Sequence, residues 1–345
     1  MSFRRGAMNS STTDLIQASQ VKASTFLVQF LHEKQQYRSS TYKAGILVNT
    51  IILLIAFPFT IALNALVMVA VKVKPRLRVH KSNILLALLA STDFMVGAFV
   101  QPTYIVVLIK GLLDHPRPYR VVPILELAIG ISAFVSLLHL ALISGERYLA
   151  MKHSFAYPIL VTDTRLLVAS ALAWILGMML HATPFVFGKA VTVYVANALV
   201  FITSACIAFC HITVYRETRR LGHQIAAQQV TEEARKQFKR NKKAVKLTSI
   251  IILLIVMCYL PFGAAVVLVS TMQHQTSLFS IFIASATSIL LLNSLFNPIL
   301  YSVRIRQLRV AMIELTFRTT QVAEAEEIEK RLFGARRAAN RIHPG

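Results

Sequence analysis

Long stretches without charged residues alternate with short basic segments along this chain. Lys, Arg, Asp and Glu are absent from 46–71, 166–188, 190–215 and 247–303. Two further stretches, 83–109 and 121–145, contain a single carboxylate each. A helix of about 20 apolar residues spans the hydrocarbon core of a bilayer. The 57 residues of 247–303 are therefore long enough for two such helices, with a polar break at 273–277.

This pattern predicts an all-α membrane protein in which seven transmembrane helices form a bundle over 46–302. The expected helices are 46–72, 83–109, 121–149, 166–187, 191–216, 244–271 and 279–302. Residues 1–45 would form an N-terminal tail, and residues 303–345 a C-terminal tail.

Basic residues near the helix ends predict the orientation of the bundle. Lys and Arg number 22 near one end of the helices and 7 near the other. Because basic loops stay on the cytoplasmic side, we expect the N-terminal tail outside the cell and the C-terminal tail inside. The first 45 residues lack the apolar segment of a signal peptide. Asn9 begins an Asn-Ser-Ser glycosylation sequon on the expected outer side.

The composition excludes several other classes of protein. Hydrophobic residues make up 55% of the chain and charged residues 15%, against about 25% charged residues in soluble domains. A formal charge of +22 would by itself suggest nucleic-acid binding. The expected topology assigns most of this charge to the cytoplasmic face, where its partner would be membrane lipid and not nucleic acid. Three cysteines exclude a disulfide-dense secreted scaffold.

Several polar side chains lie within the predicted helices at similar depth. They are Asn64, Asp93, Ser132, Ser136, Asn293 and Asn297. Polar groups inside a bilayer commonly hydrogen-bond between helices. A carboxylate with several neutral oxygens also suits a hydrated cation or a proton. A transporter or channel that uses the pocket around Asp93 is therefore an alternative function for this chain.

Short motifs occur in each of the predicted helices. They are Leu63-Asn64, Leu89 to Asp93, Glu146-Arg147-Tyr148, Trp174 with Pro184, Tyr215, Cys258-Tyr259-Leu260-Pro261 and Asn297-Pro298-Ile299-Leu300-Tyr301. In this order they resemble the motifs of rhodopsin-like (class A) G-protein-coupled receptors, from about residue 46 to 316. The chain is similar to a divergent, orphan-type member of that family.

The resemblance implies a multi-pass receptor of the plasma membrane. It would bind an extracellular small-molecule or peptide ligand and activate a heterotrimeric G protein. The residues that the family uses for activation would be Glu146, Arg147, Tyr148, Tyr215, Asn297, Pro298 and Tyr301, with a helix-six switch at Tyr259 and Pro261. A polar pocket for an allosteric sodium ion at Asp93 would be formed by Asn64, Asp93, Ser136, Asn293 and Asn297.

The C-terminal tail would begin with a short amphipathic eighth helix at about 304–316. Arg304, Arg306 and Arg309 alternate there with apolar residues such as Leu308 and Ile313. A helix of this type lies on the inner surface of the membrane.

The chain departs from the family pattern at three places that bear on function. Val122 stands where the family has the cysteine of its outer disulfide, so no disulfide is expected. Tyr259 replaces the usual tryptophan of helix six. The segment 239–243 lacks the acid that in some members pairs with the arginine of helix three. Arg147 would then be held less tightly, and we expect measurable basal activity.

The sequence does not identify the ligand. Amine receptors of the family carry an aspartate at the position of Ile129, and opsins need a lysine that 279–302 lacks, so no retinal is expected. The ligand-binding candidates are Glu126, Ile129, Ser132 and Tyr259. Glu126 would either face a ligand or extend to water at the interface. No other cofactor is expected, and without catalytic motifs the chain is not expected to be an enzyme.

Overall fold

The computed structural model describes residues 39–113, 121–184, 189–227, 232, 257–268, 277–319 and 321–342. Within these ranges the chain consists of helices and short connections. Six of the helices are long and apolar enough to cross a membrane, and a shorter apolar helix covers Met257–Leu268. The all-helical membrane architecture predicted from the sequence is confirmed.

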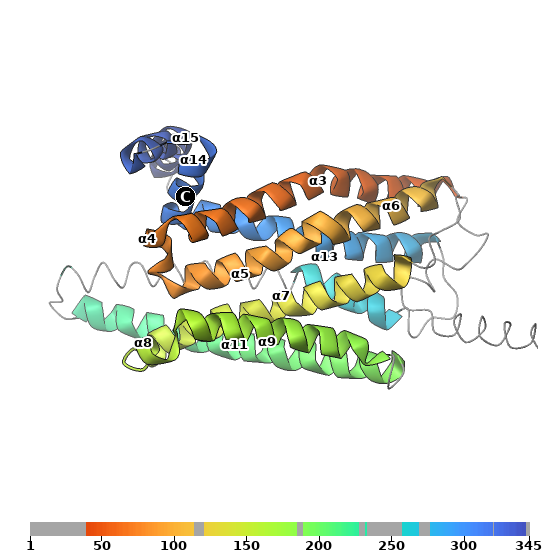
Figure 1. The fold of residues 1–345 in the computed structure, drawn as a ribbon, viewed down its shortest axis with the longest axis horizontal. Coiled ribbons are helices and arrows are strands. Elements are labelled where there is room, and N and C mark those ends of the chain that lie inside the picture. The colour runs from red at the N-terminus through yellow and green to blue at the C-terminus, as the bar shows by residue number, and fades with distance from the viewer. Residues whose placement is uncertain are drawn as a thin grey trace, which may run out of the picture.

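The long helices lie side by side along the long axis of the molecule (Figure 1). They are α3 (Ser40–Val73), α5 (Lys81–Met95), the π-helical turn η2 (Val96–Val100), α6 (Gln101–Leu112), α7 (Val121–Lys152), α9 (Asp163–Ala182), α11 (Lys189–Ala227) and α13 (Ser277–Arg304). Two single-turn helices, α4 (Pro75–Arg78) and α8 (Tyr157–Leu160), lie in the connections. The tail forms α14 (Arg306–Thr316) and α15 (Val322–Ile342) beside the end of the bundle where α3 meets α4.

Most helices extend beyond the uncharged stretches from which they were predicted, but α9 ends at Ala182, before the predicted end at residue 187. The hydroxyl of Ser39 caps α3 by accepting a hydrogen bond from the backbone N–H of Tyr42, and Thr162 caps α9 in the same way. At its other end, α11 continues past residue 216 to Ala227. The uncharged stretches therefore predicted the apolar middle of most helices. The capping and basic residues that lie at several helix ends were not part of those stretches.

The second predicted span is divided by η2. This wide turn directly precedes Pro102, which has no N–H to donate and whose ring crowds the preceding turn. Beyond the turn, the side-chain amide of Gln101 donates to the carbonyl of Leu291 at 2.9 Å, and the Tyr104 hydroxyl donates to that of Ala284 at 3.3 Å. These bonds attach α6 to α13 without exposing polar groups to lipid.

The apolar core of the bundle forms two clusters, which we call the outer and inner clusters after the topology expected from the sequence. The outer cluster contains Ile46, Tyr104, Leu125 and Ile283, and the inner cluster contains Val67, Leu85, Leu140 and Leu308. Tyr259 packs against both. Some of the buried polar residues, among them Asn64 of α3, Asp93 of α5 and Ser136 of α7, lie between the two sets along their helices. The core therefore places a polar layer midway along the bundle.

Close approach of α7 and α9 depends on a glycine in each helix. A Cβ atom added to Gly177 would lie 2.7 Å from a methyl carbon of Val135, and one added to Gly130 would lie 2.3 Å from the ring of His181. Both distances are shorter than van der Waals contact, so a side chain at either position would require Val135 or His181 to move.

The tail differs in part from the sequence prediction. The helix expected at about 304–316 is present as α14, but Arg304 ends α13 and Ile305 is an extended residue between the two helices. A further helix, α15, follows; it was not expected. Asn9 and the segment 239–243 lie outside the described residues, as does most of the predicted helix 244–271.

Candidate functional site

The polar layer joins α3, α5 and α13 at the middle of the bundle. The side-chain amide of Asn297 donates to Oδ2 of Asp93 at 2.8 Å. Asn64 donates to the carbonyls of Thr60 and Ser294, at 2.9 Å each. All three side chains are buried. Direct hydrogen bonds therefore link α13 to α3 and to α5.

Several oxygen atoms in or next to this layer have no hydrogen-bond partner among the described residues. They include Oδ1 of Asn64, Oδ1 of Asp93, Oδ1 of Asn293 and the hydroxyl of Tyr301. The side chain of Ser136 is buried as well. Buried oxygens are normally satisfied by protein, water or an ion. A buried carboxylate oxygen without a protein partner is a ligand that suits a small hard cation, so Asp93 is compatible with the sodium ion considered from the sequence.

An ion pair of a buried glutamate and a half-buried arginine lies near the C-terminal end of α7. Arg147 donates from Nε and Nη2 to the two carboxylate oxygens of Glu146, at 2.5 Å each. Glu146 is buried, whereas Arg147 is half-buried. This two-pronged contact is the strongest geometry available to an arginine and a carboxylate.

Tyr157 supplies a third hydrogen bond to this ion pair. Its hydroxyl donates to Oε1 of Glu146 at 2.6 Å. Burial, followed by the negative charge of Glu146, raises the pKa of Tyr157, so the hydroxyl stays protonated and able to donate. Tyr157 was not among the residues predicted from the sequence, because only the turn of α8 brings it back to α7.

The remaining activation residues do not meet Arg147 in this structure. Tyr215 lies on α11 with 58% of its surface exposed, and Tyr301 is completely buried in the inner cluster. Tyr148 packs its ring against His153 and Phe209. Pro298 lies inside α13, between Asn297 and Tyr301. The residues predicted to act in activation therefore lie in three places: the Glu146–Arg147 ion pair, the polar layer with the adjoining inner cluster, and the surface of α11.

The candidate ligand-binding residues lie on α7 and on the helix Met257–Leu268. Ile129 is buried in the outer cluster. The hydroxyl of Ser132 donates to the carbonyl of Ala128 at 2.7 Å, and that of Tyr259 donates to the carbonyl of Ala133 at 2.7 Å. Glu126 is half-buried near the outer end of α7. Two of the hydroxyls expected near a ligand are thus bonded to the α7 backbone.

The helix-six and disulfide positions are also described. Pro261 lies within Met257–Leu268, two residues after Tyr259. Cys206, Cys210 and Cys258 are all free, and Val122 is buried at the outer end of α7.

Acidic residues of the tail form ion pairs that the sequence did not indicate. Glu314 of α14 pairs with Lys74 and Arg76, and Glu329 of α15 pairs with Arg306 and Arg309. The sequence placed Arg309 at the lipid surface, whereas in the structure its side chain is only 7% exposed.

Comparison with known proteins gives a consistent result. The family described as "7 transmembrane receptor (rhodopsin family)" matches residues 63–301. The chain is 28% identical to the histamine H2 receptor of Homo sapiens over 132 residues, which cover 38% of this chain and 36% of that protein. It is 25% identical to the 5-hydroxytryptamine receptor 1F of Homo sapiens over 191 residues, which cover 50% of this chain and 51% of that protein. The matched segments thus span about a third to a half of these relatives.

Proposed function

Because the chain belongs to the rhodopsin family of seven-transmembrane receptors, we propose that it binds an extracellular small-molecule or peptide ligand and activates a heterotrimeric G protein. It is a multi-pass membrane protein, and its relatives are receptors and not enzymes. The observation that carries the proposal is the Glu146–Arg147 ion pair at the inner end of α7. In this pair, Glu146 engages the guanidinium of Arg147, the arginine that the family uses at its G-protein site.

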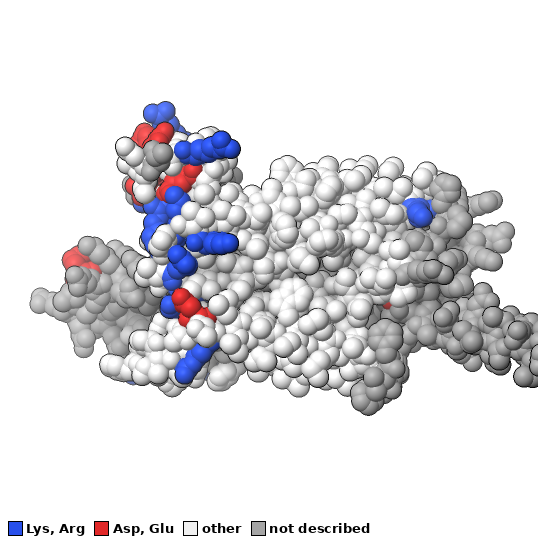
Figure 2. Space-filling model, viewed as in Figure 1, with Lys and Arg blue, Asp and Glu red and all other residues white. Residues whose placement is uncertain are grey.

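The proposed topology has seven spans in the plasma membrane, with the N-terminus outside and the C-terminus in the cytoplasm. Figure 2 shows Lys and Arg gathered in a band at the end of the bundle near α4 and α14, while the middle of the face drawn is free of charged side chains. Basic loops at one end of an uncharged belt are the expected pattern for a cytoplasmic face. In this topology α14 is the eighth helix, at the inner membrane surface.

The proposed resting state keeps Arg147 away from the G protein. Its guanidinium is engaged by Glu146, which Tyr157 fixes from the side. Activation would require Arg147 to leave Glu146, and Tyr215 and Tyr301 to approach it. Both tyrosine hydroxyls are available for this, since Tyr215 is exposed and the Tyr301 hydroxyl has no partner among the described residues. A change between two packed states of this kind would couple the outer and inner halves of the bundle.

We propose that Asp93, Ser136, Asn293 and Asn297 hold a sodium ion in the resting state, with Asn64 fixing α3 beside them. A bound cation would supply positive charge to the buried carboxylate of Asp93. Oδ2 of Asp93 already accepts from Asn297, whereas Oδ1 and Oδ1 of Asn293 have no partner in the described part of the chain. These oxygens would orient the inner half of α13 against α5.

The ligand would meet a largely apolar surface with one acidic group. The relatives are named as receptors for histamine and 5-hydroxytryptamine, but in this chain Ile129 offers no charge to an amine. The Ser132 and Tyr259 hydroxyls are engaged by α7 itself. Glu126 is therefore the polar candidate that we favour for ligand contact.

A substitution of Arg147 separates the receptor from the transporter alternative. In cells tested with a ligand panel through several G-protein classes, Arg147→Ala is expected to abolish the response. Surface expression and ligand binding should persist. Arg331→Ala removes an exposed tail arginine and serves as the control. Unchanged coupling in Arg147→Ala, or solute flux that Asp93→Asn abolishes, would favour the transporter.

A further inference from the structure

The second tail helix folds back onto the first. Arg318 has a φ of 51° and reverses the chain after α14. The reversed chain places Ala325, Ile328 and Phe333 of α15 against Val310 and Ile313 of α14. The opposite side of α14 packs on the bundle through Leu308, Ala311 and Met312. Helix α14 is therefore enclosed between the bundle and α15, and α15 occupies its second apolar face.

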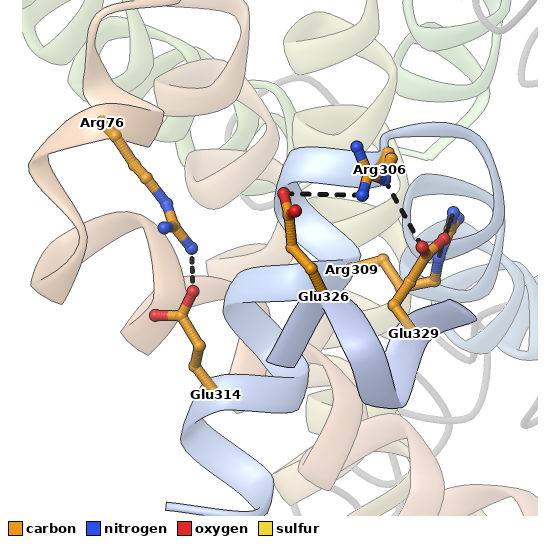
Figure 3. Close-up of polar contacts among 6 residues, drawn as sticks. All are labelled: Arg76, Arg306, Arg309, Glu314, Glu326 and Glu329. Carbon is orange, nitrogen blue, oxygen red and sulfur yellow. Dashed lines mark hydrogen bonds and ion pairs between the residues drawn. The ribbon is translucent and has the colours of Figure 1, made fainter. Parts of the chain in front are cut away.

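Charged groups fasten this contact. Glu329 of α15 is 3% exposed in its side chain and pairs with Arg309, whose Nε donates to Oε1 of the carboxylate at 3.1 Å. Arg306 lies 3.4 Å from Oε2 of Glu329 and 3.5 Å from Glu326. Figure 3 shows Glu326 and Glu329 beside Arg306 and Arg309, with Arg76 and Glu314 as a separate pair. The Arg309 guanidinium also lies 4.9 Å from the ring centre of Phe333, within the range of a cation–π contact.

Arg309 links this contact to the end of the transmembrane bundle. Its Nη1 donates to the carbonyls of Ser302 and Val303, at 2.8 Å each. These residues lie in the last turn of α13, whose carbonyls have no partner within the helix. One arginine therefore caps the helix that carries Asn297, Pro298 and Tyr301, and it is positioned by a carboxylate of α15.

A second ion-pair group holds the other end of α14. Glu314 pairs with Lys74 and Arg76 in the α3–α4 connection, and its carboxylate is 2% exposed (Figure 3). With α14 fixed at this end, docking of α15 acts mainly on the end of α14 that meets α13.

We propose that α15 is a cis clasp: it docks on α14 through Glu329, holds Arg309 on the last carbonyls of α13 and so restrains the inner end of that helix. The clasp is a property of the fold, and its role as a brake on signalling rests on the proposed receptor function. Helix α15 covers the face of α14 that contains Val310 and Ile313. That face is therefore not free to bind lipid while α15 is docked.

Hydrogen exchange of the full-length protein in lipid nanodiscs tests the clasp without any G protein. In the wild-type chain, the backbone amides of 324–333 and 302–310 should both be protected. Glu329→Gln leaves the buried Arg309 without its partner, the most destabilising way to break such a pair. We expect exchange in both segments to rise about tenfold or more. Glu327→Gln makes the same chemical change at a more exposed site of α15 and should behave as the wild type.

Three results would overturn the clasp. These are unprotected amides over 324–333 in the wild type, an equal effect of Glu327→Gln, or a Glu329→Gln effect confined to 324–333. A chain truncated after Gln321 provides a second variant, in which exchange over 302–310 must also rise. Failure to activate any G protein would contradict the proposed function. The hydrogen-exchange pattern tests the clasp alone, because that experiment contains no G protein.

Discussion

At the scale of single residues, the Glu146 carboxylate is the best-fixed group of the candidate site. It accepts two hydrogen bonds from Arg147 and one from Tyr157, and it is buried. The sequence predicted a loosely held Arg147, since no acid was found at 239–243. Tyr157 restrains Arg147 indirectly: its hydroxyl bonds to Glu146 and so fixes the partner of the arginine.

Removal of the Tyr157 hydroxyl should raise basal activity. In Tyr157→Phe, Glu146 loses one charge-assisted hydrogen bond, which is worth about 1 kcal/mol at this half-exposed position. That difference corresponds to roughly a fivefold shift towards the active state. The measurement is ligand-free nucleotide exchange on the G protein. Tyr194→Phe, at an exposed tyrosine of α11, is the matched control. Basal activity at or below the wild-type level would show that Tyr157 does not stabilise the resting pair.

Residue identities could be predicted from the sequence where a motif carries them. Asp93 and Asn297 were assigned to one pocket, and the structure joins them directly. Tyr157 and Glu329 were missed because their partners are set by the α8 turn and by the reversal after α14. Arg309 was expected at the lipid surface, since its spacing alone cannot show that a glutamate of α15 covers it.

At the scale of helices, the apolar stretches predicted which segments cross the membrane but not their internal irregularities. Pro102 was visible in the sequence as a residue inside the second span. The turn η2 that precedes it was not, because neighbouring helices determine whether a proline kinks a helix or widens a turn. The extension of α11 to Ala227 was likewise missed, since its charged and polar residues interrupt the apolar pattern.

The docked tail should be sensitive to acid and insensitive near neutrality. Burial alone would raise the pKa of Glu329, but Arg309 and Arg306 outweigh burial and hold the pKa below its usual value of 4.5. Lys74 and Arg76 do the same for Glu314. A lowered folded-state pKa contributes stability above the unfolded-state pKa, and this is lost as pH falls through the folded-state value.

We therefore expect α15 to stay docked from pH 8 to pH 5 and to be released below about pH 4. A fluorophore on Leu332→Cys, an exposed position of α15, would report the release. The wild-type chain gives the background labelling of its native cysteines, and Glu329→Gln should reduce the transition. A transition centred between pH 5 and pH 8 would contradict the assignment to these carboxylates.

At the scale of the whole molecule, charge and apolar surface are separated along one axis. Basic side chains gather at the end that carries α4 and α14, and the middle of the bundle is apolar on the face drawn (Figure 2). Part of the positive charge that first suggested nucleic-acid binding gathers at this end, where it meets acidic partners such as Glu314. The class of the protein could be predicted from this separation together with the ordered motifs. The ligand could not, because Ile129 removes the one charge that would have indicated an amine.

The most direct test is ligand-free nucleotide exchange by purified receptor in nanodiscs against a panel of purified G proteins. We predict exchange above that of empty nanodiscs for at least one G-protein class. The Arg147→Ala variant should lose this exchange while it keeps the thermal stability of the wild type. Exchange equal to empty nanodiscs for every class, or a signal that survives Arg147→Ala, would contradict this prediction.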